Sequence, residues 1–383
     1  MIRVNNQEMY SPGEIRFSNM RAMLEGAFHF VDYFGKLHSR GKVYGSSDPS
    51  RFFFDPGKGD LFFYGDDLLK EEGTPADGAD MIMNEYLAPE LVLYKKALDQ
   101  DKQGGVQPES WQLETDWYFM SVFLFEYFFQ SGSPFEGKIM VNHCFLSPEE
   151  KEYFRAEQGV FCMEPGDHGN RPVRGIQDKL IRHWDDFPEI LKKSFQRAFL
   201  SGGMLTNLRP TELDWKQVLI GLMMDYKECD CGFCGFSDLL IENENGIFSC
   251  PGCGRSYYPL SDGLNRILLT DGMNLYECQT GLDACDYHKV TGKVVENRHK
   301  EGLFGIKNLS DGVWRGFYPD RVTREITKGQ GIPIWDGMTL RFERGEDWTL
   351  RVIRSAEPFQ EETGEESIGE TTEAEAEIED NNT

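Results

Sequence analysis

Five cysteines stand at spacings that suit a bound metal ion. Cys231 and Cys234 form one Cys-x-x-Cys pair, Cys250 and Cys253 form a second, and a glycine follows each pair. Thiolates are favoured ligands of Zn²⁺, and a glycine lets the backbone turn sharply enough to present both sulfurs to one ion. We therefore predict a structural zinc ribbon whose four thiolates leave no open position for catalysis. Cys229, at the edge of the first pair, is a substitute ligand.

The other four cysteines are scattered along the chain at Cys144, Cys162, Cys278 and Cys285. We expect them to be core or surface thiols. Nine cysteines, five of them at metal spacing, favour a reducing compartment over disulfides or a redox dithiol. The N-terminus also lacks the basic and then apolar pattern of a signal peptide. The sequence thus predicts a cytoplasmic protein.

Four short motifs in the first 225 residues have the order and spacing of a protein-kinase C-terminal lobe. They are Tyr86-Leu87-Ala88-Pro89-Glu90, then Asp116, then Ser133-Pro134-Phe135-Glu136-Gly137, and finally Leu208-Arg209-Pro210-Thr211 with Trp215. Residues 10–225 therefore resemble the C-terminal lobe of a bacterial Ser/Thr-type kinase. The resemblance implies that Asp116 ties a central helix to the backbone of the catalytic loop. It also implies that Glu90, after Ala88 and Pro89, pairs with Arg209. The alternative is that Glu90 and Arg209 are ordinary surface charges.

The same resemblance places unsuitable residues at the catalytic positions. A kinase uses an Asp to accept the substrate proton, and an Asn and a second Asp to hold Mg²⁺. Here Ser46, Arg51 and Gly65 stand at those positions. A hydroxyl is a poor base at neutral pH, and a guanidinium repels a metal ion. Asp66 could serve only after a one-residue slip, and Asp48 lies two residues past Ser46.

The phosphate-holding parts of a kinase are also missing from the stretch before residue 10, which contains no Gly-rich loop and no strand Lys. The chain is therefore not expected to bind Mg-ATP or to transfer phosphate by itself.

The resemblance is narrower at two further segments, Asn170–Ile176 and the stretch from Trp184 to Leu200, which resemble a bacterial kinase-like family. Its members continue into a Cys-rich module and a β-domain and occur beside a PPM-type phosphatase and a von Willebrand A-type protein. Arg171 and Arg174 could pair on a phosphate, or be ordinary arginines.

Two predicted helices would position these residues. Ser11-Pro12-Gly13-Glu14 has the form of a capping box, and apolar residues follow at helical spacing as far as His38. Residues 117–129 are almost entirely apolar, but they are too few for a membrane span and Glu126 interrupts them. We expect the first helix to begin at Ser11 and the second to be the buried centre of the lobe.

From residue 263 onward, strand-length runs alternate with Asp-Gly turns, which predicts a β-sandwich. The strand-length runs are 265–270, 273–279, 289–296, 302–307, 324–327, 331–335, 339–342 and 349–353. Residues 305–314 and 331–342 resemble a degenerate forkhead-associated domain, which would read phosphothreonine. The Ser-x-x-His element of that family is missing. Lys307, Arg315, Arg321 and Arg324 are the basic candidates for such a site.

The charge balance excludes several classes of partner. The chain carries −25, and residues 356–383 contain eleven acidic and no basic residues. This composition predicts a disordered tail. The rest of the chain keeps a charge of −14, which argues against binding to nucleic acid or to an anionic membrane.

Together these observations predict a multidomain α+β protein. The expected parts are a kinase-like C-lobe without its N-lobe (1–225), a zinc ribbon (226–262), a β-sandwich (263–355) and an acidic tail (356–383). The expected function is a pseudokinase-type regulator or scaffold in bacterial phosphorylation-based signalling. Its partners would be signalling proteins such as the phosphatase, the von Willebrand A-type protein or an active kinase. One alternative is an active kinase whose N-lobe is supplied elsewhere, and another is a phosphopeptide-binding adaptor.

Overall fold

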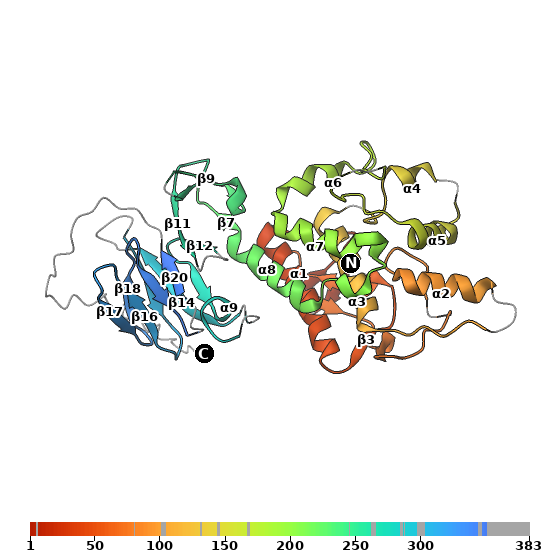
Figure 1. Ribbon diagram of the computed structural model, residues 1–383, viewed down its shortest axis with the longest axis horizontal. Coiled ribbons are helices and arrows are strands. Elements are labelled where there is room, and N and C mark those ends of the chain that lie inside the picture. Colours follow the sequence, from red (N-terminus) through yellow and green to blue (C-terminus); the bar gives the residue numbers. More distant parts are fainter. Residues whose placement is uncertain are drawn as a thin grey trace, which may run out of the picture. The chain divides into compact units, whose positions relative to one another are not determined.

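The structure is a computed structural model, and it combines helices with small antiparallel sheets, which confirms the α+β class (Figure 1). It describes residues 1–350 except 5–6, 80, 101–104, 131, 144–145, 167–168, 245, 262–265, 284–285, 287, 297–302 and 344–346. Cys144, Cys285 and the predicted acidic tail lie outside the described residues. No helix in the described part of the chain has the length and apolar character needed to cross a membrane.

The helical region, residues 1–225, is built around helix α3 (Leu113–Phe129). Nearly every side chain of α3 is buried, as its uniformly apolar sequence predicts. Helices α1 (Met20–His38) and α8 (Glu212–Asp225) pack against each other, and α1 also packs on α3. The rings of Phe30 on α1 and Phe123 on α3 stack with their centroids 3.9 Å apart.

The other elements of this region surround that core. In chain order they are β1 (Ile2–Val4), β2 (Gln7–Met9), β3 (Lys42–Tyr44), η1 (Pro49–Arg51), β4 (Phe52–Phe54), β5 (Leu61–Phe63), η2 (Asp66–Leu68), β6 (Leu69–Glu71), α2 (Pro89–Gln100), α4 (Lys138–Asn142), α5 (Pro148–Gln158), α6 (Asp178–His183), η3 (Trp184–Asp186), α7 (Glu189–Phe199), η4 (Leu200–Gly203) and η5 (Thr206–Leu208). The short strands form three two-stranded antiparallel sheets, β1–β2, β3–β6 and β4–β5.

The predicted start of the first helix at Ser11 is wrong. Residues 11–14 form a turn, in which the Glu14 N–H donates to the Ser11 carbonyl. Helix α1 begins only at Met20, where the Asn19 side chain accepts a hydrogen bond from the Ala22 N–H. The Ser18 N–H donates to the carbonyl of Pro56. This contact lies between Ser11 and Asn19, where the chain is not helical.

The remaining described residues form a small ribbon and a β-sandwich. The ribbon contains β7 (Lys227–Glu228), β8 (Cys234–Gly235), η6 (Ser237–Leu239), β9 (Ile241–Glu242), β10 (Phe248–Ser249) and β11 (Ser256–Ser261). The sandwich contains β12 (Arg266–Leu269), β13 (Asn274–Tyr276), α9 (Glu277–Thr280), β14 (Val290–Glu296), β15 (Phe304–Asn308), β16 (Trp314–Phe317), β17 (Thr323–Ile326), β18 (Gly331–Pro333), β19 (Thr339–Arg341) and β20 (Asp347–Leu350).

Two antiparallel sheets make up the sandwich. One has the order β17-β16-β19-β20-β11-β10-β9 with β12 beside β11, and the other has the order β13-β14-β15-β18. Strand β11 pairs with β10 of the ribbon and with β12 and β20 of the sandwich, so one sheet continues from ribbon to sandwich. The predicted strand at 273–279 ends at Tyr276, where α9 begins, and strand β16 was not predicted.

Candidate functional site

Four cysteines of the ribbon bring their sulfur atoms together. They are Cys229, Cys231, Cys250 and Cys253, and their Sγ atoms all lie within 4.8 Å of one another. The Cys229–Cys253 and Cys231–Cys250 Sγ pairs are each 3.5 Å apart. A disulfide would require about 2.05 Å. Thiolates about 2.3 Å from a tetrahedral metal ion are separated by about 3.8 Å, so the cluster has the spacing of a metal site.

Two similar backbone turns present these cysteines. In the first turn, the Gly232 N–H donates to the Cys229 carbonyl over 2.8 Å, and in the second the Gly254 N–H donates to the Cys250 carbonyl over the same distance. Gly232 has φ +90° and Gly254 has φ +77°, which is the left-handed region that glycine adopts without strain. The residue before each of these glycines, Cys231 or Cys253, supplies the second sulfur.

The structure leaves Cys234 outside the cluster. Cys234 lies in strand β8, where it pairs with Glu228 of β7. The glycine after it, Gly235, does not adopt a positive φ. The structure therefore groups three of the four predicted ligands with the substitute Cys229. Its first turn has the form Cys-x-Cys-Gly instead of Cys-x-x-Cys-Gly.

Polar contacts around the cluster act unequally on its thiols. The backbone N–H of Cys231 lowers the pKa of the Cys229 thiol to about 6. The backbone N–H of Phe233 lowers the pKa of the Cys231 thiol, but contacts with neighbouring cysteines raise it overall to about 12. The Gly252 N–H lies 3.4 Å from the Cys250 sulfur and donates to it. A metal ion binds thiolates and not thiols, so Cys229 is a cysteine whose surroundings favour the form that binds.

In the helical region, Asp116 and its neighbours form a buried polar network. The Asp116 carboxylate accepts the backbone N–H of Tyr44 over 2.8 Å and lies 3.1 Å from Nε2 of His38. Tyr44 is two residues before Ser46, so Asp116 on α3 holds the start of the segment that we predicted to correspond to a kinase catalytic loop. Burial would lower the pKa of His38, but hydrogen bonds with Asp116 and Glu212 raise it to about 9.

The structure also brings Glu90 and Arg209 together, 119 positions apart in the chain. Their contacts are bidentate, 2.8 Å from Nη1 to Oε1 and 2.7 Å from Nη2 to Oε2. The guanidinium also donates to the carbonyls of Glu114 and Gly203. All five N–H groups of Arg209 are therefore used. The pair joins the start of α2 to the turn before α8.

In the segment from Ser46 to Arg51, which we predicted to correspond to a kinase catalytic loop, Ser46 and Asp48 are already engaged in hydrogen bonds or an ion pair. Ser46 is buried, and its hydroxyl accepts the N–H of Asp48 over 3.2 Å. The Asp48 carboxylate accepts hydrogen bonds from Ser50 and forms a 2.9 Å ion pair with Nε of Arg51. These contacts outweigh burial and lower the pKa of Asp48. Gly65 precedes η2, which contains Asp66.

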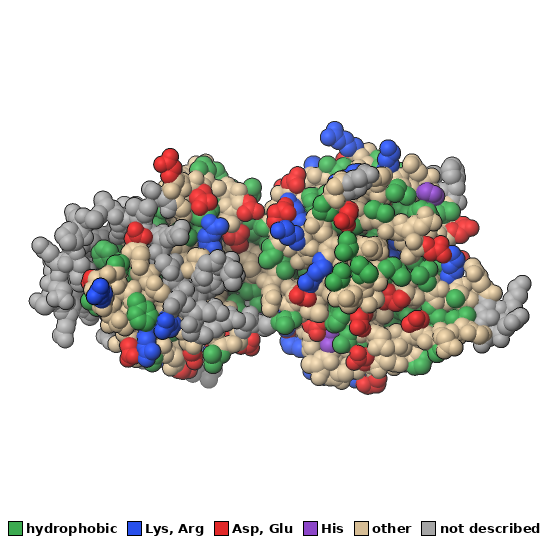
Figure 2. Space-filling model, in the orientation of Figure 1, with side chains coloured by type: hydrophobic (Ala, Val, Ile, Leu, Met, Phe, Trp, Pro, Cys, Tyr) green, Lys and Arg blue, Asp and Glu red, His purple; other side chains and the backbone are tan. Residues whose placement is uncertain are grey.

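The basic residues proposed for phosphate binding are exposed. Arg171 and Arg174 are exposed, and Arg171 donates to the carbonyl of Gly166. In the sandwich, Arg315 pairs with Glu325 on the outer face of β16 and β17. Figure 2 shows acidic and basic side chains interspersed over the face of the helical region that it draws.

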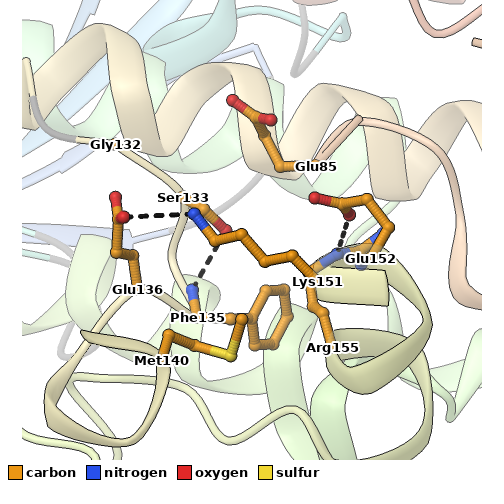
Figure 3. Close-up of a pocket in the computed structure, with 9 residues that line it drawn as sticks. All are labelled: Glu85, Gly132, Ser133, Phe135, Glu136, Met140, Lys151, Glu152 and Arg155. Carbon is orange, nitrogen blue, oxygen red and sulfur yellow. Dashed lines mark hydrogen bonds and ion pairs between the residues drawn. The ribbon is translucent and has the colours of Figure 1, made fainter. Parts of the chain in front are cut away.

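A cavity of about 80 Å³ in the helical region was not predicted from the sequence. It lies between Glu85, the turn at 132–136 and helices α4 and α5 (Figure 3). Lys151 reaches across it to Glu136, and the buried Arg155 binds Glu152 over 2.6 Å. The Arg155 guanidinium also donates to the Leu87 carbonyl. The only sequence signal was the i,i+3 charge pair on α5, which is ordinary on exposed helices.

Comparisons with known proteins find similarity among solved structures. No protein-family model and no curated protein matches the chain. Among solved structures, the chain is similar to the kinase PK-1 of Cydia pomonella granulovirus, at 18% sequence identity and a TM-score of 0.34. The similarity covers 53% of this chain and 58% of that chain. The chain thus spans somewhat over half the length of that kinase.

Proposed function

We propose that this chain is a non-catalytic, pseudokinase-type regulator or scaffold in a bacterial phosphorylation-based signalling system. The observation that carries the proposal is which side chains occupy the segment from Ser46 to Arg51 and what they contact. The residue at the position of the catalytic base is a buried serine. The carboxylate two residues further along, Asp48, is engaged by Ser50 and Arg51.

Phosphoryl transfer depends on a positioned base and on Mg²⁺ ligands. A carboxylate with a lowered pKa and an arginine partner is a weak base, and the adjacent guanidinium disfavours a metal ion. Gly65, at the second metal position of the resemblance, has no side chain to offer. We therefore expect no γ-phosphate transfer by this chain.

The contacts that hold the helical region together support a binding role. Glu90–Arg209 and Asp116–Tyr44 are buried or largely buried interactions between distant segments. Such contacts preserve the shape of a surface whether or not catalysis occurs. Partners of that surface would be other signalling proteins, including a PPM-type phosphatase, a von Willebrand A-type protein or an active kinase.

We also propose that the cysteine cluster binds Zn²⁺ and that the ion is structural. Four thiolates in a reducing compartment favour Zn²⁺ over harder cations, which prefer oxygen ligands. With four sulfur ligands the coordination is closed, so the ion would stabilise the ribbon without activating water.

Thermal melting of the metal-loaded full chain with and without Mg-ATP tests the regulatory proposal. A ligand at one hundred times its Kd stabilises a protein by about 2.7 kcal/mol. In a region of this size that corresponds to a midpoint shift of about 5–10 °C. We expect no Mg-dependent shift. A reproducible shift that requires both Mg²⁺ and ATP would instead support the alternative of a kinase with a working nucleotide site.

A further inference from the structure

A buried tyrosine hydroxyl lies beside the cysteine cluster. Tyr257, on β11, is 1% exposed and belongs to the small core of the ribbon with Cys229 and Cys250. Among the described residues its hydroxyl has no well-formed hydrogen bond. Burial, and after it an interaction with the Cys229 thiol, raise the pKa of this hydroxyl. A buried hydroxyl without an acceptor destabilises the fold, so its position in a core with two of the clustered cysteines needs an explanation.

A metal-bound sulfur would be a suitable acceptor for this hydroxyl. A thiolate keeps much of its negative charge when it is bound to a metal ion, and hydrogen bonds to such sulfurs are typical of the groups that surround metal ligands. An O–H···S contact from Tyr257 would satisfy the buried hydroxyl and stabilise Cys229 in its charged form. The free thiol of Cys229 is a much weaker acceptor.

Cys234 lies near a different tyrosine, Tyr226, which follows the last residue of α8 and packs against Phe236. Burial, and after it an interaction with the Cys234 thiol, raise the pKa of Tyr226. Cys234 also lies in a strand, whereas the turn glycine of the first knuckle is Gly232. The two cysteines that flank Cys231 are thus held in different surroundings, each beside its own tyrosine.

We propose that Tyr257 donates a hydrogen bond to Cys229 and so selects Cys229 as the fourth metal ligand, leaving Cys234 as a free thiol. The inference rests on the proposed zinc site and adds the ligand set and the residue that determines it. Tyr257 is a positioning residue, because it would act on the metal ion through Cys229.

The first experiment measures metal binding and thiol reactivity on the unmodified full chain. Zinc content by elemental analysis should be one ion per chain; a zinc-free chain that also fails to bind added zinc would overturn the zinc proposal itself. The zinc-loaded chain is then alkylated under native conditions, and the modified cysteines are identified by mass spectrometry. We expect rapid modification at Cys234 and protection at Cys229. The reverse pattern would overturn only the ligand assignment.

A matched pair of cysteine variants then tests the ligand set. In Cys229→Ser, cobalt substituted for zinc should show the weaker sulfur-to-cobalt absorption of three thiolates, and zinc should be lost to a chelator more readily. In Cys234→Ser, the cobalt spectrum and the zinc affinity should match those of the unmodified chain. Loss of a thiolate signature in Cys234→Ser, with none in Cys229→Ser, would refute the assignment.

A matched pair of tyrosine variants tests whether the Tyr257 hydroxyl selects Cys229 as a ligand. Tyr257→Phe removes one hydroxyl from a position where the ring remains packed, and it should lower zinc affinity about 10–100-fold, as loss of outer-shell partners typically does. Tyr226→Phe removes the hydroxyl beside Cys234 and should leave zinc affinity unchanged. Equal affinities for Tyr257→Phe and the unmodified chain would show that the hydroxyl does not select the ligand.

Discussion

Replacing Glu90 with Gln should strongly destabilise the helical region. The substitution keeps the size and shape of the side chain but removes the charge that faces Arg209. Arg209 is 0% exposed and donates to Glu90 through both Nη atoms. With glutamine at position 90, one of these two donors would face an amide N–H₂ group, and a buried guanidinium would have no counter-charge. The protein cannot relieve this by deprotonation, because arginine keeps its proton.

The magnitude follows from the burial of the two partners. Removing one partner of a buried ion pair costs about 3–5 kcal/mol. The Glu90 side chain is 23% exposed, so water can reach part of the site and the lower end of that range applies. A loss of about 3 kcal/mol in a region of about 225 residues corresponds to a midpoint lowered by about 6–12 °C.

Circular dichroism melting of the full chain at fixed metal loading measures this shift. The control is Glu8→Gln, which removes the partner of Arg3 from an ion pair that is 43% exposed at Glu8 and 72% exposed at Arg3, and it should leave the midpoint unchanged. The double variant Glu90→Leu with Arg209→Met should lose less stability than the two single changes added together, since neither charge is then left unpaired. If Glu90→Gln had the same melting midpoint as the Glu8→Gln control, the predicted cost of leaving Arg209 without its partner would be refuted.

Three further outcomes are expected. The pKa of folded His38 is about 9 and its ordinary value is 6.5, so its charged form stabilises the fold fully below pH 6.5 and this contribution is lost as pH rises toward 9. The difference in melting midpoint between the unmodified chain and His38→Gln should therefore shrink between pH 6.5 and 9. A difference that stays constant over this interval would contradict the raised pKa of His38. Gly203→Ala should lower the melting midpoint more than Gly175→Ala. Both residues have positive φ, but only at Gly203 would an added Cβ lie 2.8 Å from the ring of Tyr118. Equal midpoints would show that the ring moves to make room for the methyl group. Ser46→Asp should give no γ-phosphate transfer to a generic protein substrate in a radiolabel assay, and measurable transfer would contradict the regulatory proposal.

The secondary structure of the sandwich and the centre of the helical region followed from composition and periodicity. Helix α3 is apolar on every side, and a helix of this kind has to be surrounded by other elements. Most sandwich strands lie at the predicted runs because Asp-Gly turns mark their ends. The start of α1 did not follow. The sequence predicted a cap at Ser11, whereas the structure caps the helix at Asn19, and the chain between them is tied to Pro56 through Ser18.

Pairs of distant residues could not be read from spacing. Glu90 and Arg209 were expected to meet only because the motifs resemble a kinase lobe, and the structure brings them into bidentate contact. The Glu152–Arg155 pair had no such motif, and it looked like a surface pair on a polar helix. Its burial results from the packing of α5 near Leu87 and Tyr118. Local sequence gives the charges of a helix, but the packing partner decides which of them are buried.

The cysteine ribbon is another case in which sequence spacing did not identify the residues that come together, here within the six residues from Cys229 to Cys234. Cys229, Cys231 and Cys234 offer two overlapping pairs, and a glycine follows the second cysteine of each. Sequence spacing favours the pair with two intervening residues, because that is the commoner knuckle. The structure uses the shorter pair, since the backbone after Cys231 enters the left-handed region while the backbone after Cys234 continues as a strand paired with β7. Strand pairing thus separates Cys234 from the other sulfurs. A motif identifies the cysteines able to form a cluster, and tertiary contacts determine which of them come together.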